Sequence, residues 1–115
     1  MEKYLPIVNR SECNMVKLDD ILYIRKEGRK INIVTEKAAF YEYCRMGEVE
    51  EHLDERFYNC LKGVIINFNQ VQGMRDQTII FRNGITFELG RDSFIRTKQT
   101  FAAYIKGLKN LQIDR

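Results

Sequence analysis

The chain has 115 residues, of which 44% are hydrophobic and 30% charged, with a formal net charge of +3. This length allows one domain with a modest core, so we treat 1–115 as a single globular domain rather than a disordered chain. No apolar run approaches the roughly 20 residues of a membrane-spanning helix, and the N-terminus lacks a signal-peptide core. We therefore expect a cytoplasmic protein.

The charges are unevenly distributed along the chain. Residues 45–56 hold two basic and five acidic residues, a net charge of −3, whereas the other 103 residues hold 17 basic and 11 acidic residues, a net charge of +6. A basic surface with its acidic groups pooled in one element suits an anionic partner, although a solvated surface with chance clustering explains it as well.

Three cysteines, Cys13, Cys44 and Cys60, lie far apart, and the only histidine is His52 in the acidic stretch. A metal site needs clustered ligands, so we expect no metal and no cofactor. Without a secretion signal the thiols should be reduced, and we expect them to be small buried apolar residues.

The N-terminal half predicts β-strands. Residues 15–25 contain two apolar runs joined by Asp19 and Asp20, which is typical of two strands with a tight connection. Residues 30–35 alternate with a period of two and predict a third strand. Residues 40–44 predict a fourth, paired with the third.

The middle of the chain changes period. Residues 47–53 fit the spacing of a short amphipathic helix, and most of its acidic side chains should lie on the outer face, away from any nucleic acid. Residues 57–61 and 64–66 then read as two strands around a turn at Lys62 and Gly63.

Residues 78–89 give the clearest local signal, two alternating runs that flank Asn83 and Gly84. This pair tolerates positive φ, so we expect a hairpin with a two-residue turn. The chain then predicts a helix over 92–108, and residues 109–115 should fray.

The predicted C-terminal helix has polar residues suited to its start, Asp92 or Ser93 as the cap. Its apolar side chains should form one stripe, made of Phe94, Phe101, Ala102, Ile105 and Leu108. About eight short strands and two helices together predict a mainly β fold of compact antiparallel sheets.

Signatures of catalysis are missing from the sequence. It contains no glycine-rich phosphate loop, no G-x-S-x-G and no H-E-x-x-H. We therefore expect no enzyme, no catalytic residues and no small-molecule substrate.

The candidate site is basic instead. Four cations fall within six residues at one predicted turn, a fifth lies in a second turn, and a sixth precedes the C-terminal helix. Arginine and lysine in loops between short strands can reach phosphates or guanine edges in a DNA groove. The candidate DNA-binding residues are Arg25, Lys26, Arg29, Lys30, Lys62 and Arg91.

The order of these features resembles a known family. Residues 18–24, LDDILYI, with the following glycine, resemble the D-I-x-Y-I…G start of the LytTR DNA-binding domain. Phe57 with residues 64–67, VIIN, resembles its F-x-R-x-H-R-S-x-x-V-N segment, and Asn83-Gly84 with residues 89–91, LGR, resembles its N-G…S-R ending. The resemblance covers about 15–106.

The resemblance implies antiparallel sheets and binding of double-stranded DNA at promoter direct repeats in bacterial transcription regulation. Three places would read the DNA: the loop at Arg29 and Lys30, the turn at Lys62, and the strand end at Arg91. This chain departs from the family at that turn, where H-R-S is L-K-G, so its hydrogen bonds to DNA should be weaker.

Two hypotheses stay open. The first is sequence-specific DNA binding; the second is a protein-interaction module that pairs with a related regulator and has lost specific readout. We expect no receiver domain, so control would come from abundance, homodimerisation or another partner. The sequence leaves the oligomeric state open.

Overall fold

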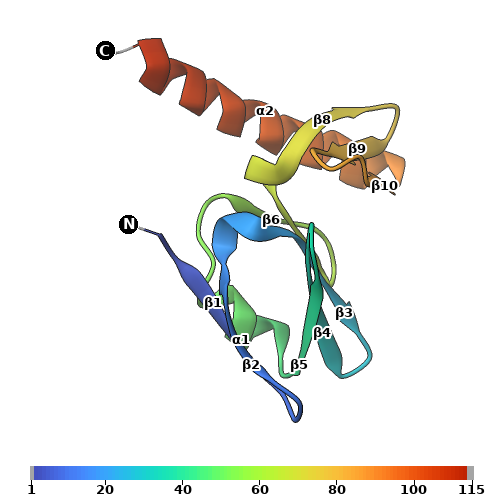
Figure 1. Cartoon of the computed structure of the whole chain (residues 1–115). Helices are drawn as coiled ribbons and strands as arrows, with labels where there is room; N and C mark the ends of the chain where they lie inside the picture. The colour runs from blue at the N-terminus through green and yellow to red at the C-terminus, as the bar shows by residue number, and fades with distance from the viewer. Residues whose placement is uncertain (1, 114–115) are drawn as a thin grey trace. The chain divides into compact units, whose positions relative to one another are not determined.

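The computed structural model describes residues 2–113, with side chains for residues 2–108, and its fold is mainly β as predicted (Figure 1). Within these residues there are ten strands and two α-helices. The chain divides into two compact units, Met1–Gln70 and Val71–Arg115. We describe each unit by itself.

The first unit contains two antiparallel sheets. A two-stranded sheet consists of β1 (Tyr4–Val8) and β2 (Cys13–Lys17). A five-stranded sheet has the order β5-β4-β3-β7-β6. Its strands in chain order are β3 (Ile21–Glu27), β4 (Lys30–Thr35), β5 (Ala39–Tyr43), β6 (Phe57–Leu61) and β7 (Val64–Asn67). The predicted pairing of the strands at 30–35 and 40–44 is confirmed.

The alternation of apolar residues places the core between these strands. Leu5 and Ile7 of β1 and Ile31 and Ile33 of β4 are each at most 2% exposed, as the period of two requires. Strand β7 is buried along its whole length, which explains the apolar run at 64–66. The β1 strand lies in a segment that the sequence pattern left unassigned.

The predicted short helix forms as α1 (Met46–Glu50), followed by a turn. The Glu48 carboxylate accepts a hydrogen bond from the Arg45 backbone N–H at 2.9 Å and so stabilises the start of the helix. Val49 is 5% exposed and anchors α1 on the core. The other side of this short helix is exposed.

Two 3₁₀ turns, η1 (Leu18–Asp20) and η2 (Phe68–Gln70), share a polar network. The Asp19 carboxylate accepts hydrogen bonds from the Arg56 guanidinium at 3.0 Å and from the Asn69 amide at 2.9 Å. Asp19 therefore organises the connection between β2 and β3, as its position in the sequence predicts.

The second unit begins with a three-stranded antiparallel sheet of order β10-β9-β8. Its strands are β8 (Val71–Arg75), β9 (Thr78–Phe81) and β10 (Thr86–Glu88). The pattern did not predict β8. Asp76 and Gln77, between β8 and β9, both have positive φ, at 53° and 59°. This is the backbone of a two-residue type I′ turn.

The hairpin at 78–89 is confirmed, but its two-residue turn was wrong. Gly84 alone has positive φ, at 94°, and its N–H donates to the Phe81 carbonyl at 2.9 Å. The Phe81 N–H donates to the Ile85 carbonyl at 2.8 Å. These bonds close a three-residue loop in which glycine takes the left-handed position, because asparagine can stay at negative φ there.

The C-terminal helix α2 (Arg91–Ile113) starts one residue earlier than predicted. Asp92 and Ser93 therefore lie in its first turn, and the prediction that either caps it was wrong. Of the segment expected to fray, residues 109–113 are helical and residues 114–115 lie outside the described residues. No helix in the described part of the chain is both long and apolar enough to span a bilayer.

The predicted apolar stripe of α2 is buried only in its first half. Phe94 and Phe101 are 9% exposed, whereas Ile105 and Leu108 are each 44% exposed. Thr97, between the two phenylalanines, is buried although it is polar. Helical spacing correctly predicted that these residues share one face, but it did not predict how far along the helix that face is buried.

Candidate nucleic-acid interface

Three chain segments meet at one end of the five-stranded sheet. Because β3, β5 and β6 run in one direction and β4 and β7 in the other, the β3–β4 turn, the β6–β7 turn and the exit of β5 share this end. The register aligns Glu27 with Lys30 and Lys30 with Tyr43. We call this end of the sheet the basic edge, defined by Lys26, Arg29, Lys30 and Lys62.

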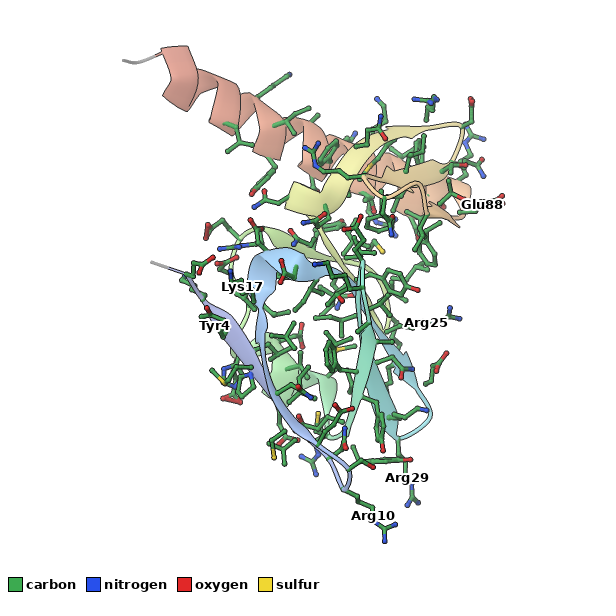
Figure 2. The ribbon with its side chains drawn as sticks, viewed as in Figure 1. Tyr4, Arg10, Lys17, Arg25, Arg29 and Glu88 are labelled. Atoms are coloured by element: carbon green, nitrogen blue, oxygen red, sulfur yellow. The ribbon has the colours of Figure 1, made fainter. Side chains whose placement is uncertain are left out.

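The β3–β4 turn presents Arg29 to solvent. Gly28 is its first central residue and has a φ of 62°, whereas Arg29 is not at positive φ. This is the pattern of a type II′ hairpin turn, in which glycine takes the strained position. The Arg29 side chain is exposed at the tip (Figure 2).

The β6–β7 turn lies beside the end of β3. The Lys26 N–H donates to the Gly63 carbonyl at 2.8 Å, and Gly63 has a φ of 79°. A Cβ on Gly63 would lie 3.4 Å from the Lys26 Cβ. Lys62 and Lys26, which are 36 positions apart in the chain, therefore belong to one surface.

Strand β5 adds two tyrosines to this surface. The Lys30 ammonium lies 5.4 Å from the centre of the Tyr41 ring, within the range of a cation–π contact. Tyr41 and Tyr43 meet edge to face with their ring centres 5.8 Å apart. Tyr43 is 64% exposed, so it can contact a partner bound at the basic edge.

Acidic groups are also present at this end. Glu50 of α1 lines a shallow hollow together with Lys26 and Lys62. Glu50 is exposed, as predicted for most acidic residues of this helix, but it lies near two residues of the basic edge. Glu27 has a local partner, because its carboxylate accepts a hydrogen bond from the Asn32 amide.

The structure brings together four of the six predicted residues and places a fifth nearby. Arg25 lies one residue before Lys26 in β3, aligned with Val64, and is exposed. Arg91 belongs to the second unit, where it is the exposed first residue of α2.

Sequence reasoning missed Arg45 and Arg10. Arg45 follows β5 at the same end of the sheet as Lys30, and both its position and Arg10's are exposed. Arg45 directly follows a predicted strand, which was the available signal. Arg10 lies in the turn between β1 and β2, and no local pattern marked it.

The cysteines occupy different environments. Burial raises the pKa of Cys60 to about 11, and it raises that of Cys44 to about 11 with help from Glu42 and Glu48. Cys13 is exposed, so the prediction that all three are buried was wrong, because the outer face of β2 is open to solvent. The described residues contain no cluster of three metal-ligating side chains.

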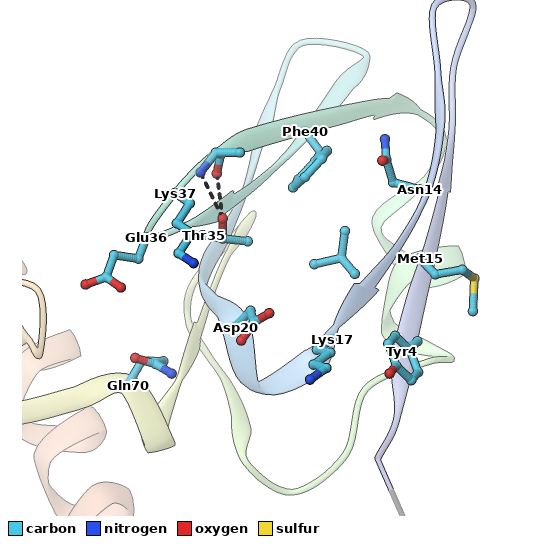
Figure 3. A pocket seen from close by; sticks show the side chains of 12 residues that line it. Tyr4, Asn14, Met15, Lys17, Asp20, Thr35, Glu36, Lys37, Phe40 and Gln70 are labelled. Atoms are coloured by element: carbon cyan, nitrogen blue, oxygen red, sulfur yellow. Dashed lines mark hydrogen bonds between the residues drawn. The ribbon is translucent and has the colours of Figure 1, made fainter.

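A second hollow, of about 420 Å³, lies at the opposite end of the five-stranded sheet (Figure 3). It is open and lined by side chains of both polarities, among them Met15, Asp20, Lys37 and Phe40. The turn from β4 to β5 beside it is closed by Thr35, whose hydroxyl accepts from the Ala38 N–H at 3.0 Å.

Comparisons with known proteins agree with this fold. The sequence model of the LytTr DNA-binding domain matches residues 11–102. A solved structure, described as the LytTr DNA-binding domain of a putative methyl-accepting/DNA response regulator from Bacillus cereus, superposes with a TM-score of 0.63 at 17% identity. It covers 94% of this chain and 97% of that one. No curated protein matches.

Proposed function

Because the chain belongs to the LytTr DNA-binding domain family, we propose that it binds double-stranded DNA through the basic edge and Arg91. The domain would regulate bacterial transcription in the cytoplasm by binding promoter sites arranged as direct repeats. Residues 1–115 would act as one domain in this role.

The observation that carries the proposal is the convergence of two turns. Each turn uses a glycine at positive φ, and together they bring Arg29, Lys30 and Lys62 to one end of a rigid sheet beside Lys26. Backbone hydrogen bonds fix the turns that carry these cations before binding, so the backbone of the turns needs no further ordering. Phosphate contacts of this kind position a protein on DNA, and base contacts add specificity.

Arg91 supports a second contact in the other unit. It follows the buried Leu89 and begins α2, so its backbone is fixed while its side chain is exposed. Arginine offers a forked donor for a phosphate or a guanine edge. Arg25 would contribute a weaker phosphate contact, because it lies farther from the turn.

The direct test is fluorescence anisotropy with duplexes from the promoters of the organism that encodes the chain, titrated from about 50 to about 200 mM salt. We expect affinity to fall steeply with salt and to fall further in Arg29→Ala/Arg91→Ala. The matched control is Lys37→Ala/Lys106→Ala, which removes the same charge, one exposed cation from each unit. The proposal is wrong if both double variants bind like the wild type.

The second candidate function, a protein-interaction module, is favoured by two observations at the same edge. Glu50 places a negative charge in the hollow with Lys26 and Lys62, and Leu61 of the adjoining turn is 36% exposed. Glu50→Gln separates the two functions. It should strengthen DNA binding if phosphates approach the hollow, and should leave DNA binding unchanged if a protein occupies it.

A further inference from the structure

The side chain of Asn9 joins the turn between β1 and β2 to the five-stranded sheet. The Asn9 amide Nδ2 donates to the Tyr41 carbonyl of β5 at 2.8 Å. Its Oδ1 accepts from the N–H groups of Ser11 at 2.9 Å and Glu12 at 3.1 Å. Asn9 therefore closes the turn and also holds it against β5.

A second bond strengthens this attachment. The backbone N–H of Val8 donates to the Glu42 carboxylate at 3.0 Å, one residue along β5 from the first contact. Both bonds join segments more than 30 positions apart, and both lie in the first unit. The position of the turn next to β5 is thus determined by two tertiary hydrogen bonds.

Tyr41 connects this turn to the basic edge. Its carbonyl accepts from Asn9, and its ring lies under the Lys30 ammonium. Arg10 at the tip of the β1–β2 turn and Arg29 at the tip of the β3–β4 turn both project at this end of the first unit (Figure 2). Two turns from different sheets thus present arginines at the same end of the first unit.

Arg10 has the chemistry of a phosphate ligand. It is exposed and forms no ion pair with any residue that the structure describes. The nearby Glu12 carboxylate instead accepts from the Asn14 amide at 2.8 Å. An arginine on a fixed turn can meet two phosphate oxygens at once, and the turn needs no further ordering.

We infer that the β1–β2 turn is a further DNA-contacting element, in which Arg10 binds a backbone phosphate and Asn9 positions it. This inference rests on the DNA binding proposed above. It adds a fourth contact to the three places that the family resemblance implies, which are one loop, one turn and one strand end. The contact is to phosphate, so it adds affinity without sequence preference.

The test uses Arg10→Ala in the full chain, with a random-sequence duplex of about 30 base pairs and the salt titration above. Loss of one phosphate contact should lower affinity roughly five- to tenfold near 0.1 M salt and reduce the salt slope by about 0.9. Arg10→Lys should keep most of the slope. Lys37→Ala, at the opposite end of the sheet, removes the same charge and serves as the control.

The positioning role of Asn9 is tested by a double-mutant cycle. Asn9→Ala should weaken binding, and Asn9→Ala/Arg10→Ala should bind no more weakly than Arg10→Ala alone, because Asn9 acts through Arg10. A purely structural effect of Asn9 would instead add to the loss caused by Arg10→Ala. Additive losses would overturn its positioning role.

The inference about Arg10 and the proposed function fail in different ways. If Arg29→Ala weakens binding while Arg10→Ala behaves like Lys37→Ala, the inference is wrong and the proposed function stands. If wild-type binding does not depend on salt and Arg29→Ala has no effect, both are wrong.

Discussion

Asn67, at the end of β7, offers the sharpest test of how the first unit is held together. Its side chain is fully buried, and its amide Nδ2 donates to the carbonyls of Ile21 at 2.9 Å and Leu18 at 3.3 Å. Its Oδ1 accepts from the Asn69 N–H at 2.9 Å. One amide thus joins the end of β7 to η1, to the first residue of β3 and to η2.

Asn67→Ala removes all three hydrogen bonds. Each contributes about 1 kcal/mol net, and a buried group left without a partner costs more. The Leu18 carbonyl still accepts a hydrogen bond from the Ile21 N–H, so it is not left without a partner. We expect the free energy of unfolding to fall by about 2–4 kcal/mol, a large part of the stability of a small domain.

The assay is urea denaturation followed by tyrosine fluorescence, since the chain has no tryptophan and five of its six tyrosines lie within residues 1–70. Asn14→Ala is the control, because that side chain makes one exposed hydrogen bond, to Glu12. It should change the free energy of unfolding by less than about 0.5 kcal/mol. A loss that small in Asn67→Ala would refute the reasoning.

Asn67→Asp separates the donor from the acceptor role. It keeps an acceptor for Asn69 but points a carboxylate at two carbonyl oxygens, so the folded state should raise the pKa of the new acid. A raised folded pKa means that stability is lost as pH rises through it. The deficit relative to the wild type should therefore be smaller at pH 5 than at pH 8.

Three further predictions concern single groups. Burial alone would raise the pKa of Asp54, but its hydrogen bonds and ion pair with Arg56 lower that pKa below its usual value. Asp54→Asn should therefore lower the free energy of unfolding by about 1–2 kcal/mol at pH 7. In urea titrations this difference should shrink as pH falls below about 4. Gly63→Ala forces a side chain into a φ of 79° and should lower the free energy of unfolding by about 1 kcal/mol. Gly47→Ala, in α1 with open space around the added Cβ, should stabilise the protein slightly. Equal effects of the two variants in thermal melts would contradict this. Iodoacetamide at pH 8 should modify the exposed Cys13 first, because the pKa values of Cys44 and Cys60 are about 11. Mass spectrometry that finds two or three modified cysteines in the native protein at early times would refute this prediction.

Much of the candidate site could be predicted because its signals are local. Gly28 and Gly63 each supply a positive φ next to a cation, and flanking alternation at 30–35 indicates strands. A period of two or a turn residue depends only on neighbours in the chain. The sequence by itself therefore determined the strands of the five-stranded sheet, the glycine turns and the exposure of Arg29 and Lys62.

Other features depend on partners distant in the chain. Strand β8 contains Gly73 and a polar residue, so its strand conformation follows from pairing with β9 and not from its own pattern. The helix α2 buries Thr97 and exposes Ile105, which helical spacing alone cannot distinguish. In each case the tertiary environment outweighs a weak local preference.

The interface shows the same division. Local sequence determined that Arg29 and Lys62 are cations on turns, but only the register of β3 with β7 places Lys62 beside Lys26. Only the hydrogen bonds that join Asn9 and Val8 to β5 bring Arg10 to the same end. Hydrogen bonds between distant segments determine which turns become neighbours, and that information is tertiary.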